Sequence, residues 1–216
     1  GLQYDSAPPY EVRATRWLRP AALDRLKTAE RALGWLYNSG RYPRALPELL
    51  ERWQGGAFAF FAAFGSFAAA QGAGEHPAQD AVAELLFLFG GSLAGMSPRR
   101  LRDLLCLDLL SSRRGGRLPG FLRVADPDHG RIAPLLRSGA ADGKGLPVEQ
   151  PGAKFHAGQL GFCILYSGAG CCSGGRALAL ADYTRRDPVT GRYALETLPL
   201  TEFFAAAGQA PGPRDP

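Results

Sequence analysis

The spacing of apolar residues changes once along this chain, and that change limits the folds it can adopt. Between residues 19 and 122, leucine, alanine and phenylalanine recur every three or four positions, which is the spacing of one helix face. From residue 159 onward, short apolar runs are separated by turn-rich clusters, which is typical of strands joined by hairpins. The sequence therefore predicts an α+β protein, mostly a helical bundle, followed by a small antiparallel β-sheet at the C-terminus.

Prolines and glycines mark the ends of the predicted elements. A first helix is expected from Pro20 to Tyr37 and should end at Asn38-Ser39-Gly40, because Asn and Gly accept the left-handed conformation of a helix end. Three further helices are expected over 46–70, 77–91 and 97–109, and the first of these should break at Gly55-Gly56. Strands are expected over 160–166, 177–183 and 193–198.

These elements divide the chain into four predicted segments. Residues 1–18 form an extended lead-in, because Pro8-Pro9 disfavours helix and Tyr10, Val12 and Ala14 alternate with polar residues. The remaining segments are a helical domain over 19–122, a long irregular connection over 123–158 with one short helix near 132–136, and a β annex over 159–216 with a flexible tail.

The chain is basic, but its charge is spread out. It has 25 Lys and Arg against 20 acidic residues, a net charge of +5 and a pI near 9.2. This balance permits nucleic acid binding without indicating it, and solvated helix ends and loops are the favoured interpretation. The alternative is an independent basic binding module for RNA or an acidic protein partner, using Arg99, Arg100, Arg102, Arg113, Arg114 and Arg117.

The compartment expected from the sequence is the cytoplasm. Four cysteines in 216 residues are too few for a disulfide scaffold, and no secretory signal is recognisable. The longest apolar stretch, 57–70, is shorter than the ~20 residues that a membrane helix needs, so we expect a buried helix and no membrane contact. The chain starts at Gly1 without an initiator Met, so we expect a piece of a longer polypeptide.

The sequence contains no complete catalytic constellation or metal site. The four cysteines, Cys106, Cys163, Cys171 and Cys172, lack metal-ligand spacing and are interpreted as core or incidental thiols, although a redox role for the Cys171-Cys172 pair stays open. The three histidines, His76, His129 and His156, are interpreted as solvated. The glycine-rich run 168–175 has no Lys-Ser/Thr after it and is expected to be a hairpin connection rather than a phosphate loop.

The segment 182–193 is the most polar candidate site. Tyr183, Arg186 and Asp187 could face a neighbouring domain or a ligand, and a self-sufficient enzyme built on this hairpin is the weakest of our hypotheses. Turn chemistry is the favoured explanation, because Asp187-Pro188 starts a turn and Gly191 supplies a positive backbone angle.

A second candidate group surrounds the first helix. It consists of Tyr10, Glu11, Trp17, Tyr37 and Asn38. Aromatic residues that flank a helix are usually core, whereas Glu11 beside Pro8-Pro9-Tyr10 can cap a helix, pair with an arginine or line a cleft.

These residues carry a family resemblance. The chain resembles the C-terminal domain, of uncharacterised function, of cobalamin-binding radical SAM proteins. The resemblance rests on Tyr4, Ser6, Pro8-Pro9-Tyr10-Glu11-Val12, Trp17-Leu18, Leu26, Tyr37-Asn38-Ser39-Gly40, Asp108-Leu109-Leu110, Pro119-Gly120-Phe121-Leu122, and the 182–191 hairpin.

The resemblance implies a longer parent with a cobalamin domain and a radical SAM barrel before Gly1. The barrel's CxxxCxxC loop is absent here, so this chain is expected to hold no cofactor, and the 4Fe-4S cluster, SAM and cobalamin are implied for the parent only. The chain would be a non-catalytic accessory domain that packs on the barrel and shapes or closes its substrate site. Residues 1–18 would be the exit from the barrel, and the partners would be the preceding domains and an unknown substrate.

Overall fold

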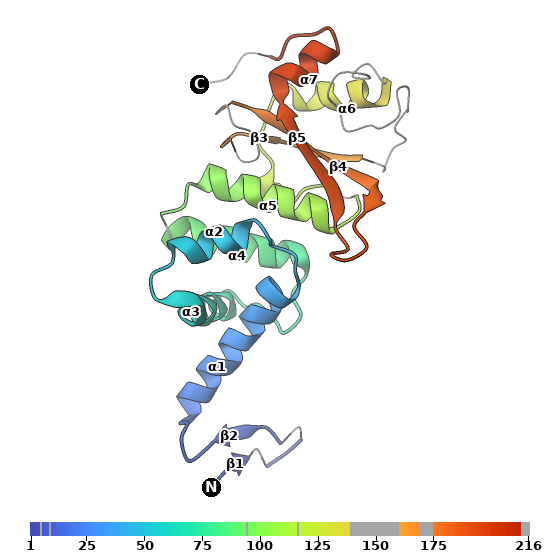
Figure 1. Cartoon of the computed structure of the whole chain (residues 1–216). Coiled ribbons are helices and arrows are strands. Elements are labelled where there is room, and N and C mark those ends of the chain that lie inside the picture. Colours follow the sequence, from blue (N-terminus) through green and yellow to red (C-terminus); the bar gives the residue numbers. More distant parts are fainter. Residues whose placement is uncertain are drawn as a thin grey trace. The chain divides into compact units, whose positions relative to one another are not determined.

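The structure is a computed structural model that describes residues 1–4, 6–8, 10–93, 95–115, 117–138, 160–168 and 175–212. The chain forms two compact units. Unit 1 comprises Gly1–Gly40 and Leu46–Gly95, and unit 2 comprises Arg41–Ala45 and Met96–Pro216. The domain boundaries predicted at residues 18, 122 and 158 stay predictions. The fold class is confirmed, because helices dominate the chain and a small antiparallel sheet follows them (Figure 1).

The lead-in of unit 1 is a short two-stranded ribbon. Strand β1 (Gln3–Tyr4) pairs antiparallel with β2 (Val12–Ala14). The Thr15 hydroxyl then accepts hydrogen bonds from the backbone N–H groups of Trp17 and Leu18, at 3.1 and 2.9 Å. This turn directs the chain into the first helix.

The first helix has the predicted start and end. Helix α1 (Pro20–Leu33) begins at a proline, whose missing N–H costs nothing in the first turn. It continues as a π-helical turn (Gly34–Asn38), and Gly40 follows with φ +63°. The left-handed residue expected in Asn38-Ser39-Gly40 is therefore the glycine.

The other helices of unit 1 bury phenylalanines and small residues. The predicted helix over 46–70 is two helices, α2 (Ala45–Arg52) and α3 (Gly56–Ala70), separated at Gly55 and Gly56, whose φ angles are +116° and +78°. Helix α4 (Gln79–Leu93) adds Phe89, which packs against Trp53 and Phe64 with ring centroids 5.6 and 5.4 Å apart. This aromatic cluster forms much of the core of unit 1.

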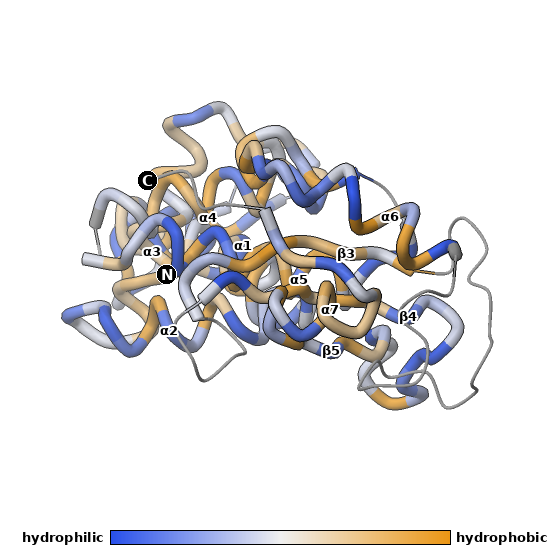
Figure 2. The backbone as a smooth tube through the Cα atoms, turned by 90° about the horizontal axis from the view of Figure 1, so that it is seen from above, coloured by the Kyte–Doolittle hydropathy of each residue, from blue (hydrophilic) through white to orange (hydrophobic). Residues whose placement is uncertain are grey.

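Unit 2 is built around the antiparallel sheet. Strands β3 (Leu160–Leu165), β4 (Ala177–Arg186) and β5 (Tyr193–Pro199) lie in the order β3-β4-β5, so β3 is an edge strand. Helix α5 (Pro98–Ser112) covers one face of the sheet (Figure 1). Helices α6 (His129–Ser138) and α7 (Leu200–Ala206) cover the other face, where Ile132, Ile164 and Phe203 are buried together. Figure 2 shows β3 as a hydrophobic segment, consistent with its burial between these helices.

Two features of unit 2 differ from the sequence prediction. The tail predicted to be flexible contains α7, which is held because Phe203 and Phe204 are fully buried. The short helix predicted near 132–136 corresponds to α6, which is longer than predicted. A 3-10 turn, Gly120–Leu122, precedes it. Residues 139–158 of the predicted irregular connection lie outside the described residues.

The apolar stretch 57–70 is a buried helix, as expected, with Phe60, Phe61 and Phe64 in the core. In the described part of the chain, no helix combines the length and apolar character needed to cross a membrane.

Candidate functional site

The candidate residues of the lead-in are exposed. Trp17 is 81% exposed, and the Arg16 guanidinium lies 4.8 Å from its ring centroid. Tyr10 is 59% exposed and has a positive φ of 54°, and Glu11 forms an ion pair with Lys27 of α1. Pro9 lies outside the described residues. The lead-in therefore presents its aromatic side chains to solvent.

Tyr37 and Asn38 do not lie with Tyr10 and Trp17. They are exposed and stand at the far end of α1, whose rise of 1.5 Å per residue puts roughly 25 Å between the two groups. The five residues grouped around the first helix therefore lie at its two opposite ends in unit 1.

Tyr183 is buried in unit 2 and 6% exposed. Its ring lies over Gly161 of the neighbouring strand, where an added Cβ would come within 2.2 Å of the Tyr183 hydroxyl, and it packs edge-on against Tyr193 at 5.0 Å. Burial raises the pKa of Tyr183. The absence of a side chain at Gly161 is what makes room for this tyrosine.

Arg186 and Asp187 build the hairpin turn. One Asp187 carboxylate oxygen accepts hydrogen bonds from the backbone N–H groups of Val189 and Thr190 at 3.0 and 2.6 Å, and from the Thr190 hydroxyl. The hydrogen bonds from Thr190 lower the pKa of Asp187. Arg186 donates from Nε to the carbonyl of Gly191 at 2.7 Å, and Gly191 has φ +68°. The turn chemistry favoured from the sequence is confirmed.

A buried ion pair joins α5 to the end of β3. Arg102 donates to the Asp103 carboxylate at 2.7 Å and to the backbone carbonyls of Leu122 and Ile164 at 2.8 and 2.5 Å. The other Asp103 oxygen accepts the backbone N–H groups of Tyr166 and Ser167 at 2.7 and 2.8 Å. Arg102, which the alternative hypothesis places on a binding surface, is instead a buried structural residue.

A second ion-pair network surrounds the start of β4. Arg176 lies 3.1 Å from Asp126 and 3.0 Å from Asp128, and it also donates to the carbonyl of Gly212 at 2.7 Å. The Tyr166 hydroxyl donates to Asp126 at 2.9 Å. Burial and this hydrogen bond raise the pKa of Tyr166, so the phenol keeps its proton at neutral pH.

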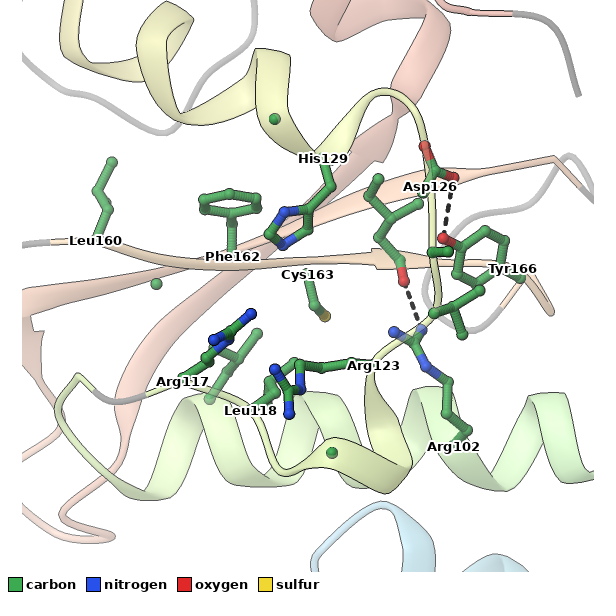
Figure 3. Close-up of a pocket in the computed structure, with 17 residues that line it drawn as sticks. Arg102, Arg117, Leu118, Arg123, Asp126, His129, Leu160, Phe162, Cys163 and Tyr166 are labelled. Atoms are coloured by element: carbon green, nitrogen blue, oxygen red, sulfur yellow. Dashed lines mark hydrogen bonds between the residues drawn. The ribbon is translucent and has the colours of Figure 1, made fainter.

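Unit 2 contains a pocket of about 620 Å³ (Figure 3). It lies at the edge strand β3, between the loop that follows α5 and the first residues of α6. Apolar walls come from both strand and loop, and basic side chains line another part of the pocket. The apolar lining residues include Leu118, Val124, Leu160 and Phe162, and the basic ones are Arg102, Arg117, Arg123 and His129.

Arg102 also lines the pocket and is paired with Asp103, but two other arginines of the lining are not neutralised. Figure 3 shows Arg117 and Arg123 pointing into the pocket from one side, opposite His129. Neither guanidinium has a hydrogen-bond or ion-pair partner within the described ranges. The one acidic lining residue, Asp126, is already paired with Arg176. The pocket therefore carries an excess of positive charge.

The floor of the pocket contains a cysteine of the core. A hydrogen bond with Cys106 and burial raise the pKa of Cys163 well above its ordinary value, so the thiol stays protonated at neutral pH. Cys106 and Cys163 are buried free thiols, as the sequence predicts, while Cys171 and Cys172 lie outside the described residues. No group of three or more His, Cys, Asp or Glu side chains is placed to hold a metal ion within the described residues.

Sequence reasoning did not identify this pocket. It interpreted His129 as solvated, and His129 is indeed exposed, but its ring also lies 5.1 Å from that of Phe162. Arg117 belongs to a group of arginines for which the sequence favours solvated loops and helix ends, and no sequence pattern points to Arg123. His76 is exposed, and His156 lies outside the described residues.

Comparison with known proteins identifies a family. Residues 1–146 match the model of a family described as "Protein of unknown function (DUF4080)". No curated protein matches the chain, and no solved structure does.

Proposed function

The chain belongs to the family described as Protein of unknown function (DUF4080), and from this premise we propose that it is a non-catalytic accessory domain of a cobalamin-dependent radical SAM enzyme. In this proposal it packs on the preceding barrel of the same polypeptide and shapes or closes the substrate site. The proposal rests on the sequence resemblance and on one structural observation, the exposed aromatic lead-in.

The lead-in leaves several large apolar side chains in water. Leu2, Tyr4, Tyr10 and Trp17 are all largely exposed, within the first 17 residues of the chain. Clusters of exposed large apolar side chains mark interaction sites. Tyrosine and tryptophan are also the side chains that contribute most at interface centres. These residues support docking of the lead-in on another protein surface.

The proposed partner is the radical SAM barrel, since the lead-in would be its exit. Radical chemistry needs a site from which water is excluded, and closing elements provide that exclusion. The parent's cluster, SAM and cobalamin would be held by the preceding domains. The two described cysteines do not fit a CxxxCxxC loop, because Cys106 lies in α5 and Cys163 in β3.

The proposal is tested first by the coding DNA upstream of Gly1. An in-frame segment that encodes CxxxCxxC supports it, and a start codon directly before Gly1 contradicts it. In the full-length polypeptide, amide hydrogen exchange at residues 10–18 should then be at least about tenfold slower than in this chain alone, because docking buries these residues.

The Trp17→Ser substitution provides a matched test of docking. In the full-length enzyme it should restore rapid exchange at residues 10–18 and lower substrate turnover about tenfold, while the iron content of the cluster stays unchanged. Val189→Ser is the control, because Val189 is 91% exposed at the tip of the β4–β5 hairpin. Equal turnover in the Trp17→Ser and unmodified enzymes would refute a role for the lead-in in closing the site.

A further inference from the structure

The pocket of unit 2 has the features of a ligand site that the proposed function does not use. We propose that it binds a phosphate monoester whose organic part is apolar and ring-shaped. This inference is independent of the accessory-domain proposal, because every residue that carries it belongs to unit 2 of this chain.

The two arginines of the pocket favour an anion. Both are exposed, so water solvates their charges when no ligand is bound. A guanidinium is suited to bidentate binding of a carboxylate or phosphate, and two guanidinium groups that face one space can both contact an anion placed between them. Arg117 and Arg123 have no such partner in the described part of the chain, and Asp126 cannot serve because Arg176 and the Tyr166 hydroxyl occupy its oxygens.

The Arg123 guanidinium lies close to the backbone at Gly120. A Cβ on Gly120 would lie 3.3 Å from a terminal nitrogen of Arg123, so the guanidinium rests directly on the 3-10 turn. His129 faces the arginines from the start of α6 and supplies a further hydrogen-bond donor (Figure 3). The loop and the helix thus hold three basic groups around one space.

A phosphate monoester fits these groups better than a carboxylate does. A carboxylate has one charge and two oxygens, which one guanidinium fork already satisfies. A phosphate monoester carries about −1.5 to −2 charges at neutral pH and has three terminal oxygens, enough for both arginines and the imidazole.

The apolar walls argue for a ring-shaped organic part. Phe162 presents its ring next to His129, and Leu118, Val124 and Leu160 line the same space. The volume of about 620 Å³ is within the range of roughly 300–1,000 Å³ typical of small-molecule sites. A free phosphate would leave this apolar surface unused.

Isothermal titration of the whole chain with 1-naphthyl phosphate tests the proposal. We expect one molecule to bind per chain, at least about tenfold more tightly than 1-naphthol, inorganic phosphate or 1-naphthaleneacetate. If 1-naphthol binds as tightly as 1-naphthyl phosphate, the pocket has no anion site. If inorganic phosphate binds as tightly, the apolar walls contribute nothing to binding. Comparable binding of the acetate would refute the phosphate class, and absence of binding would refute the whole proposal.

Arginine variants locate the binding. Arg117→Gln and Arg123→Gln should each weaken 1-naphthyl phosphate binding about tenfold, as loss of a charge-assisted hydrogen bond predicts, and leave 1-naphthol unaffected. Arg99→Gln is the control, because it removes the same charge from an exposed position outside the pocket. Equal losses in all three variants would show that only net charge attracts the ester, and unchanged binding in the two pocket variants would place the ester elsewhere. Either result overturns the proposal.

Discussion

Two buried carboxylates of α5 differ in how their charges are compensated. Asp103 is paired with Arg102 at 2.7 Å and accepts three further hydrogen bonds. Asp108 accepts the backbone N–H groups of Arg44 and Ala45, at 3.2 and 2.9 Å, but the Arg44 guanidinium is 3.5 Å away and partly solvated. Burial raises the pKa of Asp108 to about 7, although these hydrogen bonds oppose the shift. Asp108 is therefore a carboxylate that titrates near neutral pH.

Asp108 should make the stability of the chain depend on pH. Its folded pKa of about 7 exceeds the value of about 3.9 in an unfolded chain, so the folded state holds the proton longer as pH rises. The stabilisation is complete below about pH 4 and is lost as pH rises through about 7. Between about pH 5 and pH 8, the free energy of unfolding should fall by roughly 2–3 kcal/mol relative to Asp108→Asn.

Urea denaturation at several pH values measures this difference. Asp187→Asn is the control, because the pKa of Asp187 is lowered by hydrogen bonds from Thr190 and its contribution to stability is lost only as pH falls below about 4. If the free energies of unfolding of the unmodified chain and of Asp108→Asn differ by the same amount at every pH, the pKa of Asp108 is not raised by folding.

At the scale of elements, local residue chemistry explains which predictions succeeded. Pro20 and Pro98 start their helices, and glycines with positive φ separate α2 from α3, so these boundaries follow from backbone sterics alone. Helix α7 was missed because seven residues are too few for a helical period, and it is held by burial of Phe203 and Phe204 against the sheet. Whether such a short segment forms a helix depends on its tertiary contacts, which the local sequence pattern does not show.

The contact between α1 and α3 depends on a single glycine. A Cβ on Gly65 would lie 2.5 Å from the backbone oxygen of Thr28 in α1, so Gly65→Ala forces the helices apart. We expect a loss of roughly 1–3 kcal/mol in the free energy of unfolding of unit 1, measured by urea denaturation. Gly91→Ala in α4 is the matched control, because nothing lies within 4 Å of an added Cβ there. The better helix propensity of alanine should stabilise that variant by about 0.5–1 kcal/mol. Equal effects of the two substitutions would contradict a tight crossing at Gly65.

At the scale of the whole molecule, the candidate pocket could not have been predicted from the sequence. Its basic residues, Arg117, Arg123 and His129, come from a loop and a helix start that resemble ordinary solvated segments. Only the folded sheet brings Leu160 and Phe162 of β3 against them. Conversely, the sequence makes Tyr183 and Asp187 candidate site residues because they are polar and close together. In the structure, Tyr183 packs on Gly161 of the sheet and Asp187 accepts hydrogen bonds within the turn.

The two units provide separate probes of unfolding. All three tryptophans, Trp17, Trp35 and Trp53, lie in unit 1, so tryptophan fluorescence follows unit 1 alone. Asp103→Asn leaves Arg102 buried without its charge partner, which should lower the stability of unit 2 by about 3–5 kcal/mol. Because each unit has its own buried core, this variant should shift the circular dichroism transition to lower urea concentration while the fluorescence midpoint stays unchanged. A fluorescence midpoint that moves together with the dichroism would mean that the units unfold in one cooperative step, and the Asp103 network would then stabilise the whole chain.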